Sequence, residues 1–122
     1  MKIDYLVDTN ILISLFNNQL RQAIPNGIIG YSVITTIEIL SFKGLSSQEE
    51  SLIRSRLQHS IQVFINETIA EKTIQLRRQY RLKMPDAIIA ASAWDCEAVL
   101  ITNDKQLSKI SQIQVLSLPI KS

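Results

Sequence analysis

The sequence is poor in cysteine, histidine, glycine, proline and aromatic residues. Its 122 residues include one Cys, one His, three Gly and three Pro, and only 6% are aromatic. A single cysteine, Cys96, excludes an intrachain disulfide and is typical of a reducing cytoplasm. The chain is nevertheless long enough to bury a hydrophobic core that needs no covalent crosslink. We therefore expect a core held by apolar packing alone.

Long apolar runs and a strong excess of charge are also missing. The apolar runs reach only about five to seven residues, far short of the roughly 18 that cross a bilayer. Polar residues at Asp4, Asp8 and Asn10 interrupt the segment where a signal peptide would be apolar. We therefore expect a cytoplasmic protein with no membrane association. The net charge is only +2, so a polyanion would have to be bound by a local basic patch.

The order of predicted elements indicates the fold class. Without repeats, low-complexity tracts or an internal linker, residues 1–122 are expected to form one domain. Strands are predicted at Ile3–Val7, Ile28–Tyr31, Ile61–Ile65, Ala98–Thr102 and Gln114–Leu118. Helices are predicted at Ile11–Phe16, Val33–Phe42, Ser46–Gln58, Glu67–Tyr80, Pro85–Trp94 and Asp104–Ile110, with a helical turn ending at Pro25–Gly27. This alternation predicts an α/β protein: a three-layer α/β/α sandwich with a mostly parallel five-stranded sheet.

Two of the five aspartates follow predicted strands. Asp8 comes directly after Val7, and Asp104 comes shortly after the run that ends at Thr102. Ligands of parallel α/β sheets bind beyond the carboxyl ends of the strands. Both aspartates are therefore expected at the ligand-binding edge, although each has an alternative role as a helix cap.

Two further acids lie in predicted helices. Asp86 opens an almost wholly apolar helix after Pro85, where an acid also complements the helix dipole. Glu38 has Ile34 and Ile37 as helical neighbours. A carboxylate on an apolar face is costly unless a partner, such as a Lys or Arg, pairs with it.

The capping, dipole and pairing roles explain each of the four acids separately. A single site would explain why all four are expected on one side of the sheet. Carboxylates that lie close together repel, so protons or cations must neutralise them. A set of oxygen ligands without His or Cys favours Mg²⁺ or Mn²⁺ over Zn²⁺. His59 lies near the end of a predicted surface helix and is not expected to be a ligand.

The acids occur in four motifs whose order resembles a known signature. The motifs are Asp8-Thr9-Asn10, Thr35-Thr36-Ile37-Glu38, Pro85-Asp86-Ala87-Ile88 and Ile101-Thr102-Asn103-Asp104. From Ile3 to about Leu118 the chain resembles PIN-domain ribonucleases, in particular the VapC-type toxins of VapBC toxin–antitoxin pairs. The resemblance implies that Asp8, Glu38, Asp86 and Asp104 are catalytic and hold one or two Mg²⁺ or Mn²⁺ ions. It also implies that Thr9, Asn10 and Thr102 orient the carboxylates or metal-bound waters.

The function that this resemblance implies is metal-dependent hydrolysis of RNA phosphodiester bonds by the toxin of a type II toxin–antitoxin system. An endoribonuclease of this kind would leave 5′-phosphate and 3′-hydroxyl ends without a covalent intermediate. His59 alone does not supply the acid–base pair that metal-free cleavage through the 2′-hydroxyl normally uses. The implied partners are the RNA substrate, a small cognate antitoxin and a second copy in a homodimer. Apolar residues at 11–16 or 45–53 are candidates for these protein contacts.

The main alternative is a non-catalytic RNA- or protein-binding module on the same fold, against which the presence of all four acids argues. Phosphorylation-receiver domains and haloacid-type phosphatases fit poorly, the latter because position 10 is Asn10 rather than Asp. One departure from the family is the turn Trp94-Asp95-Cys96-Glu97 before the fourth predicted strand, which lacks the glycine common there and leaves the end of the preceding helix open.

A basic segment precedes the Asp86 motif. Arg77, Arg78, Arg81 and Lys83 lie within seven residues that contain no acid. These side chains could grip phosphates that flank the scissile bond. Arginines near a helix C-terminus also stabilise the helix dipole, so both interpretations stay open.

Overall fold

The sheet consists of five short parallel strands. In the computed structural model, which describes residues 2–121, the strands lie in the order β3-β2-β1-β4-β5, and all four neighbouring pairs are parallel. Their bounds are β1 Tyr5–Val7, β2 Ile29–Ser32, β3 Ile61–Val63, β4 Val99–Ile101 and β5 Val115–Leu116. With β1 at the centre, the order reverses between β1 and β4. Ligands of such sheets bind near this reversal.

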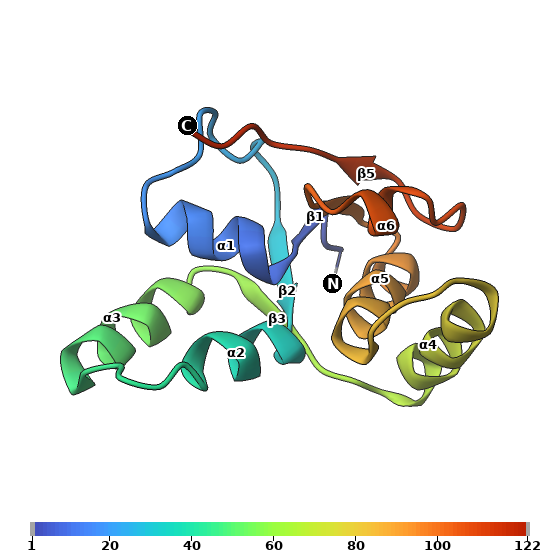
Figure 1. The fold of residues 1–122 in the computed structure, drawn as a ribbon, viewed down its shortest axis with the longest axis horizontal. Coiled ribbons are helices and arrows are strands. Elements are labelled where there is room, and N and C mark those ends of the chain that lie inside the picture. The colour runs from blue at the N-terminus through green and yellow to red at the C-terminus, as the bar shows by residue number, and fades with distance from the viewer. Residues whose placement is uncertain (1, 122) are drawn as a thin grey trace.

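Helices cover both faces of the sheet (Figure 1). They are α1 Thr9–Phe16, α2 Val33–Leu40, α3 Ser47–Leu57, α4 Glu67–Gln79, α5 Met84–Cys96 and α6 Lys105–Ser108. Successive strand residues belong to two hydrophobic cores on opposite faces of the sheet. Leu6 and Leu100 pack with α4 and α5, whereas Val7 and Ile101 pack with α1 and α3. The predicted three-layer sandwich with a parallel five-stranded sheet is therefore confirmed.

Local capping signals determine where most helices begin. The side chains of Ser32, Ser46, Asn66 and Asp104 each accept a hydrogen bond from a backbone N–H of the first turn. Ser46 and Glu49 form a reciprocal capping box at the start of α3. Each such cap contributes about 1 kcal/mol to stability. These starts therefore match the sequence prediction closely, because the signal is local.

The segment between α1 and β2 differs from the prediction. The helical turn expected to end at Pro25–Gly27 is absent, and residues 17–28 form no helix. Instead, Leu20 forms an antiparallel bridge with Ile120, and the backbone N–H of Arg21 donates to the carbonyl of Pro119 at 3.0 Å. The prediction was wrong because this segment takes its backbone partners from the far end of the chain.

Helix α5 lies against the sheet and is buried over most of its length. Seven consecutive residues from Ala87 to Ala93 are buried. The helix begins at Met84, one residue before Pro85, and ends at Cys96. Its C-cap residue Glu97 has a φ of 53°, in the left-handed region that glycine occupies most easily. The missing glycine therefore does not extend the helix.

No helix within residues 2–121 is both long and apolar enough to span a membrane.

Candidate active site

Asp8 and Thr102 leave the sheet side by side. Val7 of β1 is in register with Ile101 of β4, and the backbone N–H of Asp8 donates to the carbonyl of Ile101 at 3.1 Å. The Thr102 hydroxyl donates to Oδ2 of Asp8, whereas Oδ1 accepts from the backbone N–H of Ile11 at 2.9 Å. Asp8 is only 5% exposed. It is therefore both the N-cap of α1 and a buried carboxylate at the switch point of the sheet.

Thr102 also connects Asp8 to Asp104. Its oxygen accepts from the backbone N–H of Asp104 at 3.0 Å. Oδ1 of Asp104 in turn accepts from the backbone N–H of Gln106 at 2.8 Å and caps α6. The capping role considered for Asp8 and Asp104 is thus present in both. It does not exclude a second role, because each carboxylate oxygen has more than one acceptor site.

Glu38 is held by a hydroxyl of the neighbouring helix rather than by a basic residue. The Thr9 hydroxyl donates to Oε1 of Glu38 at 2.7 Å. Thr9 Oγ1 also lies 2.9 Å from Oγ1 of the buried Thr35. The ion pairs among residues 2–121 are Arg54–Glu50 and Lys72–Asp95, so the Lys or Arg partner considered for Glu38 is not found there.

Asp86 lies in the first turn of α5 and is half-buried. Burial raises the pKa of Asp86, the charges of Asp104 and Glu38 raise it further, and Lys83 opposes them. Burial also raises the pKa of Asp8, although hydrogen bonds from Thr102 and Ile11 oppose this effect.

The charges of Asp104 and Asp86 add to the rise in the pKa of Asp8. Through these interactions Asp8, Glu38, Asp86 and Asp104 form one electrostatically coupled group. These pairwise effects are in keeping with the convergence expected at the carboxyl edge of β1 and β4, which stays a prediction.

The raised pKa values make stability depend on pH. A carboxyl group whose pKa is higher in the folded than in the unfolded state favours folding below its ordinary pKa. That contribution is lost as the pH rises through the folded-state pKa. Ionised Asp8 and Asp86 therefore lower the free energy of unfolding near neutral pH in the metal-free protein. A cation bound at this edge would offset that loss of stability.

The kinds of donor atom at this edge suit a hard cation, whereas their spacing does not yet form a cation site. The group supplies carboxylate oxygens with the hydroxyls of Thr9 and Thr102 beside them, and the exposed Asn10 adds an amide on the first turn of α1. Oxygen donors without sulfur or imidazole favour Mg²⁺ or Mn²⁺ over Zn²⁺. In the described part of the chain, no three side chains of His, Cys, Asp or Glu lie close enough together to bind a metal ion.

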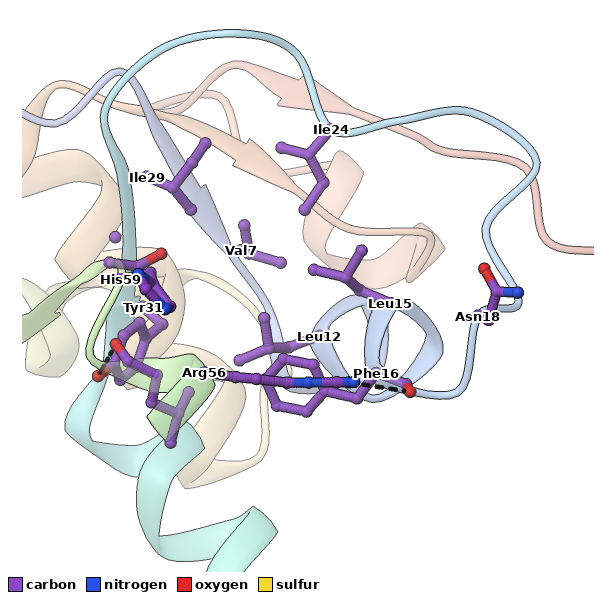
Figure 2. Close-up of a pocket in the computed structure, with 13 residues that line it drawn as sticks. Val7, Leu12, Leu15, Phe16, Asn18, Ile24, Ile29, Tyr31, Arg56 and His59 are labelled. Atoms are coloured by element: carbon purple, nitrogen blue, oxygen red, sulfur yellow. Dashed lines mark hydrogen bonds between the residues drawn. The ribbon is translucent and has the colours of Figure 1, made fainter. Parts of the chain in front are cut away.

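Two hollows of the surface differ in their relation to these acids. One, of about 500 Å³, lies among α1, the segment after it, β2 and residues 56–60, where Arg56 stacks over Phe16 (Figure 2). None of the four acids is among its lining residues. The other, of about 370 Å³, is an apolar groove between α1, α2 and α3 that has Glu38 in its wall. Only the second hollow therefore adjoins the candidate site.

Thr35 is a site residue that sequence reasoning missed. Its hydroxyl is fully buried and contacts Thr9, 26 residues earlier in the chain. The adjacent Thr36 contacts Gln62 instead. The one signal in the run Val33–Leu40 that separates the two threonines is spacing, because Thr35 lies three residues before Glu38 and Thr36 lies two. The contact with Thr9 itself arises from the packing of α1 against α2.

Known proteins with this arrangement identify the family. Residues 5–113 match the PIN domain family. The chain is similar to one from a toxin–antitoxin complex from Klebsiella pneumoniae, at 35% sequence identity and a TM-score of 0.77, covering 93% of this chain and 96% of that chain. It is similar to a chain of VapBC-1 from nontypeable Haemophilus influenzae, at 27% identity and a TM-score of 0.78, covering 94% and 98%.

A further solved structure supports the fold alone. A chain of VapBC2 from Rickettsia felis, bound to a DNA fragment from their promoter, has a TM-score of 0.78 and 20% identity over 94% of this chain and 98% of that chain. Comparison with curated proteins gave no match. The family match spans β1 to β4 and all four acidic motifs, and the predicted resemblance is confirmed. The chain belongs to the PIN domain family.

Proposed function

We propose that this protein is a metal-dependent endoribonuclease and the toxin of a type II toxin–antitoxin pair. The observation that carries the proposal is the coupled group of Asp8, Glu38, Asp86 and Asp104 at the switch point of the sheet. Membership of the PIN domain family supports it, as does similarity to a chain from a toxin–antitoxin complex. We place the enzyme in the cytoplasm and expect a homodimer, as the family resemblance implies.

The four acids would hold one or two Mg²⁺ or Mn²⁺ ions. When bound, such an ion stabilises negative charge on a phosphodiester and lowers the pKa of water. Thr102 holds the buried Asp8 in one orientation, and Thr9 does the same for Glu38. Asn10 would orient water or substrate with its exposed amide. Neither His59 nor Cys96 belongs to this group, so we expect direct hydrolysis that leaves 5′-phosphate and 3′-hydroxyl ends.

The basic turn between α4 and α5 would bind the RNA backbone. Arg77 and Arg78 lie in the last turn of α4, and Lys83 lies close enough to Asp86 to lower its pKa. The Arg77 side chain reaches across to the sulfur of Met84 at the start of α5. These residues therefore bring positive charge to the edge where a scissile phosphate would lie.

We expect Arg77→Ala with Arg78→Ala to raise KM for RNA several-fold at low salt and to leave kcat nearly unchanged. Each lost phosphate contact reduces the dependence of log K on log salt concentration by about 0.7 for single strands, so the variant should also be less sensitive to salt. Steady-state kinetics from low to moderate salt would measure both effects. Arg21→Ala with Arg54→Ala removes the same charge elsewhere as a control. Equal kinetics in the two double variants would assign the α4 pair to helix stabilisation.

The groove beside Glu38 is where we propose that an antitoxin binds. Its walls include Ile13 and Phe16 of α1 together with Leu45, Leu52 and Ile53. These residues come from both segments that the sequence suggested for protein contacts. The groove therefore has an apolar surface with the Glu38 carboxylate at its side. An amphipathic antitoxin segment with a basic residue near Glu38 matches that chemistry, because the basic group would compete with the cation and with RNA.

Cleavage of total RNA tests the proposed activity. The purified protein should cut RNA with Mg²⁺ or Mn²⁺, stop on addition of a chelator and resume when metal is restored. Asp86→Asn should not cut under the same conditions. Cutting that needs neither metal nor Asp86 would contradict the proposal. RNA binding without any cutting would favour the non-catalytic module.

A further inference from the structure

Two threonine hydroxyls connect the buried side of α2 to Glu38. Thr35 and Glu38 are three residues apart, so they lie on the same face of the helix. The Thr9 side chain of α1 lies between them, 2.7 Å from Oε1 of Glu38 and 2.9 Å from Oγ1 of Thr35. The three polar groups therefore form a continuous chain across the contact of α1 with α2.

The direction of donation in this chain follows from the number of protons. An ionised carboxylate only accepts, so Thr9 donates its one hydroxyl proton to Glu38. The proton in the contact between the two threonines must then come from Thr35. Thr35 is 0% exposed, so water does not offer its hydroxyl an alternative acceptor. The order is Thr35 to Thr9 to Glu38.

This order matters because Glu38 is exposed and its side chain has several rotatable bonds. We propose that Thr35 is a positioning residue, which acts through Thr9 to hold the Glu38 carboxylate toward Asp86 for cation binding. The inference rests on the proposed function. It assigns a task to a residue that would touch neither cation nor RNA. Hydrogen bonds along such a chain strengthen one another, so the inner hydroxyl affects the outer contact.

The test compares Thr35→Val with Thr35→Ser and with Thr36→Val. Valine keeps the shape of threonine and removes the donor, whereas serine keeps the donor. Thr36→Val removes a hydroxyl from the adjacent residue, whose contact is with Gln62 rather than with Glu38. Mn²⁺ affinity is measured by titration calorimetry. We expect Thr35→Val to weaken it about 10-fold, as the loss of partners that support metal ligands does, and the other two variants to stay within about 2-fold of wild type.

A second background shows whether the effect passes through Glu38. In Glu38→Ala there is no carboxylate to position, so adding Thr35→Val should change Mn²⁺ affinity less than about 2-fold. Thr9→Val should reproduce the loss seen with Thr35→Val, which covers the case that Thr35→Val does not fold. Equal losses in Thr35→Val and Thr36→Val, or an undiminished loss in Glu38→Ala, would overturn the proposal.

Crystal structures of the metal-free proteins separate the inference from the proposed function. If wild type binds no Mn²⁺, the proposed function fails, and the positioning claim is then judged from the Glu38 side chain alone. Positioning by Thr35 requires an ordered Glu38 against Thr9 in wild type and a displaced or multiply oriented Glu38 in Thr35→Val. An unchanged Glu38 in that variant would refute the role of Thr35.

Discussion

Asp8→Asn is expected to reduce RNA cleavage at least about 100-fold, the scale seen when one preorganised electrostatic group is removed from an active site. Asp8 is the most buried of the four acids and lies where β1 and β4 end together. The variant removes its negative charge and alters its volume little. Cleavage rates with Mn²⁺ at fixed ionic strength, compared between variant and wild type, would measure the effect.

The same variant should remain folded and be at least as stable as wild type near neutral pH without metal. Asn caps helices about as well as Asp, so the hydrogen bond from Ile11 is retained. In wild type, burial raises the pKa of Asp8, so stability falls as the pH rises through that value. Asp8→Asn should show a smaller fall between mildly acidic and neutral pH. Unfolding of the variant would instead assign Asp8 a purely structural role.

Mn²⁺ is expected to raise the melting temperature of the wild-type protein by roughly 10 °C at 100 times its dissociation constant. Binding to the folded state alone contributes about 2.7 kcal/mol at that concentration, and 1 kcal/mol corresponds to about 4 °C in a domain of this size. Burial raises the pKa of Asp8, and the charges of Asp104 and Asp86 raise it further, so a bound cation would offset both the burial of this charge and the repulsion. Scanning calorimetry across a metal titration measures the shift.

Two variants separate a cation site from general ionic effects on melting. Asp86→Asn removes one acid of the coupled group and should lose most of the shift. Glu49→Gln removes an acid whose tasks are the capping box of α3 and a place in the groove wall, and should keep the shift even if its baseline stability is lower. An unchanged melting temperature at millimolar Mn²⁺, or equal shifts in wild type and Asp86→Asn, would count against the site.

The parts of the fold predicted correctly are those with local signals. Caps such as Ser46 and Asn66 lie beside the helices they start, and the periodicity of each helix is contained in its own residues. The irregular segment from 17 to 28 was mispredicted because Leu20 pairs with Ile120, a hundred residues away. Four of the five strands are shorter than predicted, because apolar residues such as Ile65 and Ala98 continue the pattern beyond the paired residues. The remaining strand, β2, keeps its predicted length and is shifted by one residue.

Three of the four acids could be proposed from their places in the elements, because Asp8 and Asp104 follow strand ends and Asp86 stands at a helix start. Glu38 lies inside α2 and was proposed from its motif and its apolar helical neighbours. Their contacts could not be predicted from sequence. Thr102 follows from the register of β1 and β4, and Thr35 from the packing of α1 on α2. For Asp8 and Asp104 the capping interpretation is correct, and it accompanies membership of the coupled group rather than replacing it.

The most direct test of the central claim is the anomalous difference density of Mn²⁺ in crystals of the wild-type protein grown or soaked with the metal. We expect one or two peaks within bonding distance of carboxylate oxygens from Asp8 and Asp86, with Glu38 or Asp104 contributing directly or through water. Ordered density for all four side chains with no peak among them, at a metal concentration that supports cleavage, would contradict the account.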